Sequence, residues 1–372
     1  MTALVFTPEH DELRRSVRRF LEAKSPSAAV RALMADETGY DTEVWKQMAN
    51  QLGLQGIAIP ERFGGSGFSF VELAIVLEET GRGLVPAPYL SSVVMAGYAI
   101  LDSGDESAAA DLLPGIADGS RVATLAFTED SGRWEPDAIT MPATADGDRW
   151  LLNGAKSYVV DGHIADLLVV AAETAAGLSL FAVDPATPGI TRSLLPTLDQ
   201  TRKLARITFD DVPARLIGTP GGAVATLPRT LDKVALALAA EQVGGTQRVL
   251  DMAVEYAKVR HQFDRPVGSF QAIKHKAADM LARLESARSA AYYGAWAVAT
   301  DSDEVPTVAS LAKAYCSDAF FFAAAENIQI HGGVGFTWEH DAHLYFKRAK
   351  STQLFLGDTP YHREQLAQRI GI

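Results

Sequence analysis

The chain has 372 residues, 48% of them hydrophobic, which is enough for two or three domains around a large buried core. Its formal net charge of −12 disfavours nucleic acid or an anionic membrane as the main partner, because both are bound by clustered Lys and Arg. Cys316 is the only cysteine, which excludes an intrachain disulfide and a cysteine-rich metal site.

The first third of the chain carries helical patterns. Charges interrupt the N-terminus where a signal peptide needs a continuous apolar stretch, and no apolar run reaches membrane-spanning length, so we expect a cytoplasmic protein without membrane insertion.

In the same third of the chain, apolar residues recur three and four positions apart, as at Leu13, Val17, Phe20 and Leu21. Five glycines and a proline in residues 52–70 predict a loop. We predict an N-terminal α-helical domain over residues 1–120.

Short runs typical of strands begin at Arg121. They are rich in Val, Leu, Ile, Thr and aromatic residues and are separated by Asp, Gly, Asn and Pro: RVATLAFTE, RWLLNGAKSYVVDG, ADLLVVAA, LSLFAVD and KLARITFDDV. No helix-length segment separates them, which favours an antiparallel sheet or a small barrel over a parallel βαβ sheet. We predict a middle antiparallel β domain over residues 121–217.

Helical periodicity returns after residue 217 and continues to the C-terminus. Three long periodic segments and a tail predict four helices, and long helices of this kind form a bundle. We therefore predict a C-terminal four-helix bundle domain over residues 218–372. The predicted fold class is α+β, in the order α, β, α.

Several common cofactor motifs are absent. The glycine-rich stretches GGSGF and GGVGF do not continue into the GxGxxG pattern that follows a strand, no P-loop is present, and no Glu-x-x-His pair supports a di-iron site. These absences disfavour a Rossmann-type nucleotide site, a P-loop enzyme and a di-iron bundle.

Two other stretches carry groups suited to a nucleotide. Arg260 and Phe263 stand one turn apart at a helix break, where an Arg can grip phosphate and an aromatic ring can cover a heteroaromatic one. In QIHGGVGF, residues 329–336, glycines let the backbone approach an anion closely and Gln329 can donate from its side chain. Either stretch alone is explained as simply by a solvated charge or by a helix C-cap.

Taken in this order, the motifs resemble the acyl-CoA dehydrogenase family over essentially the whole chain. The matching stretches are PERFGGSG, AFTE, LNGAKSYVVDG, RHQFDRPVGSFQ and QIHGGVGFTWE. The family's Arg-x-x-Phe-Gly is matched by Arg260 to Phe263, with Asp264 in place of glycine, and its Gln-x-x-Gly-Gly-x-Gly is matched without gaps from Gln329. The resemblance implies that the adenosine diphosphate part of FAD binds, from a neighbouring subunit, to Arg260, Gln262, Phe263, Gln329, Gly332 and Gly333.

The resemblance also implies that the β domain holds the isoalloxazine ring. Thr128 can then reach the pyrimidine edge of the flavin. In the family a hydroxyl that faces flavin N5 follows a Trp, and the equivalent stretch here gives Tyr158 and Val160. The family's Gly-Ser-Asp after Thr-Glu, which contacts the coenzyme, is reduced here to Ser131.

The activity implied by the resemblance is α,β-dehydrogenation of an acyl-CoA thioester to the trans-2-enoyl-CoA, in β-oxidation of a fatty or bulky, steroid-like acyl chain. A carboxylate removes the α-proton while the β-hydrogen leaves as hydride to FAD. An electron-transferring flavoprotein is the expected acceptor of the electrons.

The base of that reaction is missing from its usual position. Counted without gaps from Gly335, the family's Tyr-Glu-Gly-Thr falls on residues 355–358, so Leu356 replaces the glutamate. A second family position for the base falls near Val234. Two carboxylates lie close to these positions, and we prefer Glu241, on the same helix face as Val234, over Asp358 as the catalytic residue. The alternatives are a buried structural carboxylate paired with an Arg or a backbone group for Glu241, and a helix cap or turn former for Asp358.

These departures leave several interpretations open. The chain can be a self-sufficient dehydrogenase that forms a homodimer or homotetramer. It can instead be a non-catalytic or semi-catalytic subunit of an α2β2 heterotetramer with a second chain of the family, as in bacterial enzymes that shorten steroid side chains. A flavin monooxygenase or nitroalkane oxidase on the same fold is a third interpretation, because a fold does not fix its chemistry.

Overall fold

The computed structural model describes residues 6–147 and 149–372. Contacts divide the chain into two compact units, one made of Met1–Arg31, Phe70–Val85 and Ala235–Ile372, the other of Ala32–Ser69 and Pro86–Val234. The helices of the predicted N-terminal domain are therefore divided between both units, and its first five residues lie outside the described residues. In the described ranges, no helix combines the length and the apolar character needed to cross a membrane.

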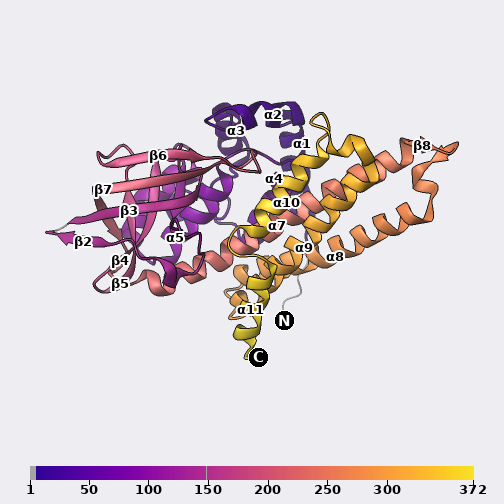
Figure 1. Ribbon diagram of the computed structural model, residues 1–372. Helices are drawn as coiled ribbons and strands as arrows, with labels where there is room; N and C mark the ends of the chain where they lie inside the picture. The colour runs from indigo at the N-terminus through magenta and orange to yellow at the C-terminus, as the bar shows by residue number, and fades with distance from the viewer. Residues whose placement is uncertain (1–5, 148) are drawn as a thin grey trace. The chain divides into compact units, whose positions relative to one another are not determined.

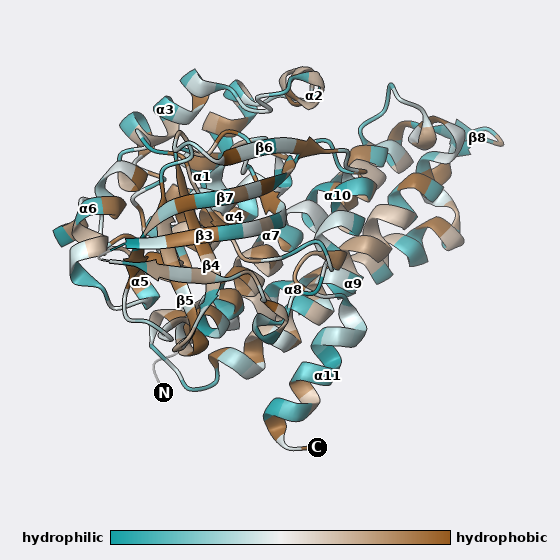
Figure 2. Cartoon of the chain, turned by 60° about the vertical axis from the view of Figure 1, so that its left-hand side comes forward, coloured by the Kyte–Doolittle hydropathy of each residue, from teal (hydrophilic) through white to brown (hydrophobic). Residues whose placement is uncertain are grey.

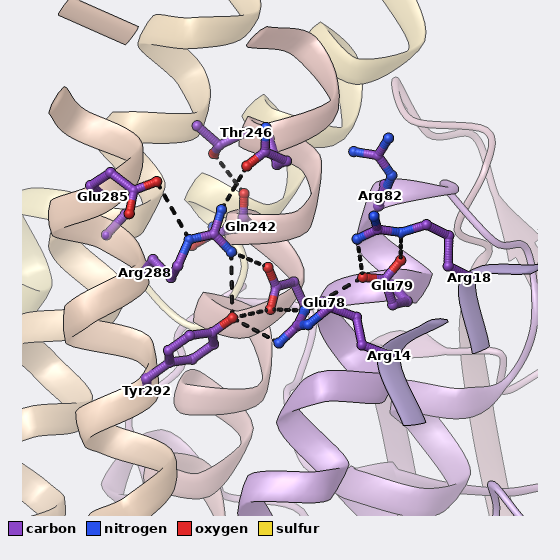
Figure 3. Close-up of polar contacts among 12 residues, drawn as sticks. Arg14, Arg18, Glu78, Glu79, Arg82, Gln242, Thr246, Glu285, Arg288 and Tyr292 are labelled. Carbon is purple, nitrogen blue, oxygen red and sulfur yellow. Dashed lines mark hydrogen bonds and ion pairs between the residues drawn. The ribbon is translucent and has the colours of Figure 1, made fainter. Parts of the chain in front are cut away.

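A buried network of charges connects three helices of the first unit: α1 (Pro8–Lys24), α4 (Phe70–Arg82) and α8 (Gln271–Ala299). Glu78 accepts from Arg14 at 2.6 Å, from the Tyr292 hydroxyl at 2.6 Å and from Arg288 (Figure 3). Its neighbour Glu79 is held in bidentate fashion by Arg18, at 2.9 and 2.7 Å. Each buried carboxylate thus has its cations in place, which offsets the cost of taking the charge out of water.

The helical bundle of the same unit is built on α8, α9 (Val305–His331) and the part of α7 (Ala223–Val259) that follows Val234, and these helices run alongside one another in Figure 1. The crossing of α4 and α7 requires glycine. A Cβ at Gly81 would lie 2.0 Å from the carbonyl oxygen of Glu241, and one at Gly244 would lie 1.8 Å from that of Glu78. Cys316 of α9 is buried and donates to the Ala287 carbonyl at 3.4 Å.

The tail of the bundle differs from the single fourth helix that periodicity predicts. It forms two helices, α10 (Ala342–Leu354) and α11 (Thr359–Ile370). Leu356 and Gly357 between them have φ of 63° and 99°, and left-handed residues cannot continue an α-helix. Shorter elements complete this unit, namely the hairpin β8 (His261–Gln262) and β9 (Arg265–Pro266) and the 3-10 turns η4 (Val267–Ser269) and η5 (Gly332–Phe336).

The helices of the second unit precede its sheet. Asp41 caps α3 (Thr42–Leu52) by accepting from the backbone N–H groups of Glu43 and Val44. The predicted loop that follows contains only the 3-10 turn η1 (Glu61–Phe63), so that prediction is confirmed. The remaining helical elements are the π-helix η2 (Leu90–Ala96), α5 (Gly97–Asp102) and α6 (Glu106–Ala117), while α2 (Ser27–Ala35) has residues in both units.

The sheet of the second unit has seven strands in the order β1-β4-β5-β7-β3-β2, with β6 also paired to β7. The strands are β1 (Ala123–Ala126), β2 (Ala143–Asp146), β3 (Arg149–Val160), β4 (Leu167–Thr174), β5 (Gly177–Val183), β6 (Ile190–Leu195) and β7 (Leu204–Ile217), and η3 (Pro136–Ala138) precedes β2. Strand β5 is largely hydrophobic (Figure 2), and Leu152 of β3, Val170 of β4 and Phe181 of β5 are fully buried in the core of this sheet.

The prediction of an antiparallel sheet holds for every described pair of this sheet except one. Strands β1 and β4 are parallel, with Ala123 opposite Leu167. A parallel pair needs a long connection, and here β2 and β3 lie between the two strands in sequence and supply it. Strands β2 and β6 were not predicted, because both carry mostly exposed residues and lack the apolar runs used to find the others.

Candidate active site

The two stretches expected to bind adenosine diphosphate lie at the same end of the helical bundle. The rings of Tyr256, in the last turns of α7, and His331, at the end of α9, stack with their centroids 4.2 Å apart. Residues 260–263 follow Tyr256 by one turn, and residues 329–333 surround His331. The structure therefore brings together two stretches that are about seventy positions apart in sequence.

The side chains of this end are exposed and largely uncommitted. Phe263 is 86% exposed, and Arg260, Gln262 and Gln329 are also exposed. Within the described part of the chain Arg260 makes no ion pair, whereas Gln262 donates to its neighbour's carbonyl at 2.8 Å. An arginine and an amide that face outward can bind a phosphate or a ribose supplied from outside this chain.

The backbone geometry of the same end permits close approach. A Cβ at Gly332 or Gly333 would meet nothing within 4 Å, and Gly332 has a φ of 63°. Phe263 and Asp264 have φ of 56° and 58°. Asp tolerates the left-handed region better than most residues, which explains how Asp264 can replace the family's glycine. These features fit the adenosine diphosphate part of FAD.

In the second unit the residues expected at the flavin ring also come together. The backbone N–H of Ser157 donates to the Thr128 carbonyl at 2.8 Å, which sets Tyr158 beside Thr128. The Thr128 hydroxyl is buried without a hydrogen-bond partner in the described residues. A buried unpaired hydroxyl costs free energy unless something satisfies it, so this atom fits the polar edge of a flavin.

A bulge in β3 determines how the other two predicted residues lie. The register shifts between Lys156 and Val159, and Tyr158 in the bulge has a φ of 58° and is 39% exposed. Val160 is fully buried, and its carbonyl accepts from the Thr124 hydroxyl at 2.6 Å. Tyr158 can therefore contact a ring from outside the sheet, while Val160 contributes to the core.

Two acidic side chains next to Thr128 hold this segment in place. Lys156, fully buried, donates to Glu129 at 2.9 Å and to the Phe127 carbonyl at 3.1 Å. Burial lowers the pKa of Lys156 to about 8, although Glu129 acts in the opposite direction. Arg206 pairs with Asp130 at 2.6 Å and, together with a hydrogen bond from Ser157, lowers the Asp130 pKa to about 2. Both carboxylates are therefore used inside the domain.

At the turn where the family carries its base, Leu356 is buried, with 4% exposure. Its carbonyl accepts from Nε2 of His362 at 3.0 Å, so that nitrogen carries the proton. Burial and the nearby Lys313 charge lower the His362 pKa to about 3, which keeps the imidazole neutral. Nδ1 of His362 is buried and has no partner among the described residues.

The buried side chain of Lys313, on α9, holds the same turn by hydrogen bonds. Its Nζ donates to the Gln353 carbonyl at 3.3 Å, in the last turn of α10, and to the Gly357 carbonyl at 3.1 Å, in the turn that follows. Burial lowers the pKa of Lys313 to about 7. The turn is held by contacts within the chain, and Leu356 offers no group that can take a proton.

The two carboxylates considered as substitute bases are both engaged. Glu241 is buried, and Nη1 of the equally buried Arg348 donates to it at 2.5 Å, linking α7 to α10. Asp358 is exposed and caps α11 by accepting from the Tyr361 backbone N–H at 3.0 Å. Val234, the second family position, is fully buried. These are the structural roles that the sequence leaves open as alternatives.

Sequence reasoning did not name Arg348, Lys313 or His362. All three are polar residues whose side chains are buried in the bundle. A basic residue that recurs at an apolar position of a helical period is the signal that could have found Arg348 and Lys313, because such residues are rarely buried without a partner.

Family models match nearly the whole chain. Those of the acyl-CoA dehydrogenase N-terminal, middle and C-terminal domains cover residues 7–120, 124–212 and 223–371. The chain therefore belongs to the acyl-CoA dehydrogenase family, whose members are FAD-dependent oxidoreductases that act on CH–CH bonds.

Similar proteins include a curated acyl-CoA dehydrogenase and two solved complexes, one of which is described as a steroid ACAD. The chain is 38% identical over 350 residues to the acyl-CoA dehydrogenase IpdE2 of Mycobacterium tuberculosis, covering 94% of this chain and 93% of the relative. A variant of the Tcur3481-Tcur3483 steroid ACAD has a TM-score of 0.89 at 32% identity, with 98% of each chain covered. The ChsE4-ChsE5 complex of Mycobacterium tuberculosis has a TM-score of 0.90 at 29% identity, covering 100% of this chain and 99% of the other.

Proposed function

We propose that this chain is one subunit of a two-chain acyl-CoA dehydrogenase that acts on a bulky, steroid-like acyl-CoA. In this proposal residues 260–263 and 329–333 bind the adenosine diphosphate part of FAD. The partner chain binds the isoalloxazine ring of the same FAD and supplies the catalytic carboxylate. The observation that carries the proposal is the turn at Leu356, where the usual base is a buried leucine and both nearby carboxylates are occupied by Arg348 and by a helix N-terminus.

The roles of this chain's residues follow from their exposure. Bound FAD supplies the hydride acceptor, and this chain contributes binding and orientation. Arg260 offers a fork of donors to a diphosphate, and Phe263 offers an exposed ring that a neighbour can cover. The likeness to two solved complexes, each named for two chains, supports the choice of an α2β2 assembly over a homo-oligomer.

A self-sufficient homodimeric or homotetrameric dehydrogenase is the second candidate. The unpaired Thr128 hydroxyl favours it, because this atom fits a flavin held by the chain's own β domain. Glu241 would then have to act as the base, which requires that Arg348 release it. An electron-transferring flavoprotein is the proposed acceptor in either case. The full-length matches favour both candidates over a monooxygenase or nitroalkane oxidase.

We retain three further proposals from the sequence. The domain boundaries are 1–120, 121–217 and 218–372. The compartment is the cytoplasm, where the single buried Cys316 would stay reduced. The reaction is α,β-dehydrogenation to the trans-2-enoyl-CoA.

The first experiment compares the visible spectrum and native mass of the chain purified alone with those of the chain co-purified with a second acyl-CoA dehydrogenase-like chain. The two-chain proposal expects a colourless or unstable protein alone and a yellow α2β2 complex. A yellow homo-oligomer with one flavin per chain that turns over an acyl-CoA would contradict it and would favour the second candidate.

A pair of variants then locates the base. In the two-chain enzyme, Glu241→Gln leaves turnover within about twofold, whereas replacing the carboxylate at the partner's corresponding turn abolishes it. The opposite pattern would assign the base to Glu241. A folding control is needed because Glu241 is buried, and the unfolding midpoint of each complex supplies it.

A further inference from the structure

A cavity of about 210 Å³ lies within the first unit, among α1, the start of α2, the end of α4, α7 and α10. Three arginines line it: Arg18, Arg82 and Arg248. Leu84 and Leu344 form part of an apolar wall. The volume is below that of drug-sized pockets, roughly 300–1,000 Å³, so the cavity suits a small ligand with a few waters. None of its lining residues belongs to the stretches assigned above to FAD.

Three acidic residues also line the cavity, namely Glu22, Glu79 and Asp341, and Glu22 is exposed to solvent. Glu79 is already held by Arg18 at 2.7 Å and contacts Arg14 at 3.4 Å (Figure 3). Asp341 is held by Arg31 at 2.8 Å and by the Ser27 hydroxyl at 2.7 Å. These two carboxylates are therefore occupied by cations or hydroxyl groups of their own.

The arginines, by contrast, have donors to spare. Arg82 uses Nη1 for Asp251, at 2.7 Å. Arg248 is only partly exposed and makes no ion pair within residues 6–147 and 149–372. A guanidinium has five N–H donors and stays charged, so Arg248 and the unused edge of Arg82 present several donors to one cavity. Arg18 and Arg82 each have a carboxylate partner, whereas the Arg248 charge has none within the described residues and would be stabilised by an anion in the cavity.

Tyr345 closes the side of the cavity next to Arg248. Its hydroxyl donates to the Arg82 carbonyl at 2.6 Å, which fixes the chain at the end of α4. Burial raises the pKa of this hydroxyl to about 12, so it remains neutral and does not act as the missing anion. Arg248 shares a hydrogen bond with this hydroxyl but forms no ion pair with a carboxylate within the described residues.

We propose that this cavity is a second ligand site, which binds a phosphate group between Arg248 and the free edges of Arg82 and Arg18. The phosphate can be the free ion or the terminal 3′-phosphate of a nucleotide. Phosphate accepts several charge-assisted hydrogen bonds at once and matches the fork of a guanidinium, which makes it the small anion best suited to three converging arginines.

The test is isothermal titration of inorganic phosphate, and separately of 3′,5′-ADP, into the full chain at constant ionic strength. We expect saturable binding that weakens at least tenfold in Arg248→Gln and several-fold in Arg248→Lys, because Lys keeps the charge but loses the fork. Tighter binding of 3′,5′-ADP than of phosphate would identify a nucleotide as the source, and the reverse would identify the free ion.

Two matched controls make the result specific. Arg15→Gln changes an exposed arginine of α1, outside the cavity, and should leave the affinity unchanged. Arg260→Gln removes the arginine of the expected FAD stretch and should also leave it unchanged. Phosphate binding that is lost in Arg260→Gln but kept in Arg248→Gln would overturn the proposal, as would the absence of saturable binding at millimolar phosphate in the folded wild-type chain.

Discussion

The end of the bundle around Arg260 and the turn at Leu356 carry the two halves of one expected chemistry, but they differ in how their polar groups are used. Around Arg260 the side chains are exposed, and Arg260 itself makes no ion pair within the described residues. Around Leu356 the carbonyls are satisfied by Lys313 and His362, and the nearby carboxylates by Arg348 and a helix N-terminus. Hydrogen-bond donors without a partner in the chain are available to bind a ligand, whereas groups that already have partners serve the structure.

The sharpest way to break this comparison is to remove Arg348. Arg348→Met leaves the buried Glu241 charge without its cation, which should cost about 3–5 kcal/mol of unfolding free energy. The double variant Glu241→Leu/Arg348→Met removes both charges and should recover most of that loss. Urea unfolding measures both variants. A loss below about 1 kcal/mol in the single variant would mean that Glu241 does not depend on Arg348.

Arg260 tests the other side of the comparison. Arg260→Gln should raise the dissociation constant of FAD in the assembled enzyme by roughly ten- to a hundredfold, as expected for hydrogen bonds to a charged group worth about 1.5–3 kcal/mol. Lys258→Gln, an exposed charge in the preceding turn, is the control and should retain flavin. Flavin fluorescence during dilution measures the loss. Equal retention in both variants would remove Arg260 from the cofactor site.

The pH dependence of the unfolding free energy tests whether the buried Lys313 at the Leu356 turn is neutral in the folded chain. The folded chain releases the Lys313 proton near pH 7, whereas the unfolded chain keeps it up to its ordinary pKa of 10.5. The unfolded state thus binds more protons above pH 7, and the folded state gains stability as the pH rises, by about 2 kcal/mol between pH 7 and 9.

Lys313→Met should remove this contribution of about 2 kcal/mol and leave the smaller gain from Lys156, whose pKa is about 8, while Lys46→Met, at an exposed position of α3, should retain both. Chemical unfolding at a series of pH values measures the slope. The same slope in wild type and Lys313→Met would show that the buried amine is not the group that titrates.

Asp358 gives the smallest expected effect and separates a cap from a base. Asp358→Ala should cost about 1 kcal/mol, the usual loss for an N-cap, whereas Asp358→Asn keeps the cap and should be nearly neutral. Turnover of the complex should be unchanged in Asp358→Asn. A stable Asp358→Asn variant that loses turnover would make Asp358 the base.

The sequence predicts the order of helices and strands well because their patterns are local. The helical spacing within α1, the loop after α3 and five of the strands follow from periodicity and turn residues. The parallel pairing of β1 with β4 depends on contacts between distant segments. The break in the tail helix depends on the left-handed backbone at Leu356, a conformation that leucine seldom adopts and that tertiary contacts impose.

In the candidate site, too, the features set by local sequence could be predicted and those set by long-range contacts could not. Glycines and an arginine at fixed spacing made the adenosine diphosphate stretches recognisable from sequence. The occupation of Glu241 by Arg348 involves residues more than a hundred positions apart, so no local pattern reveals it. The three arginines of the proposed phosphate site likewise come from three different helices, and none of them stands in a sequence motif.

The single thiol of the chain offers a chemical reporter of this architecture. Cys316 is enclosed between α9 and α8, and burial raises its pKa to about 12, so almost none of it is thiolate at neutral pH. Alkylating reagents attack the thiolate, so labelling should be negligible while the helices stay packed. The labelling rate in native buffer then measures how often the bundle opens, without any engineered probe.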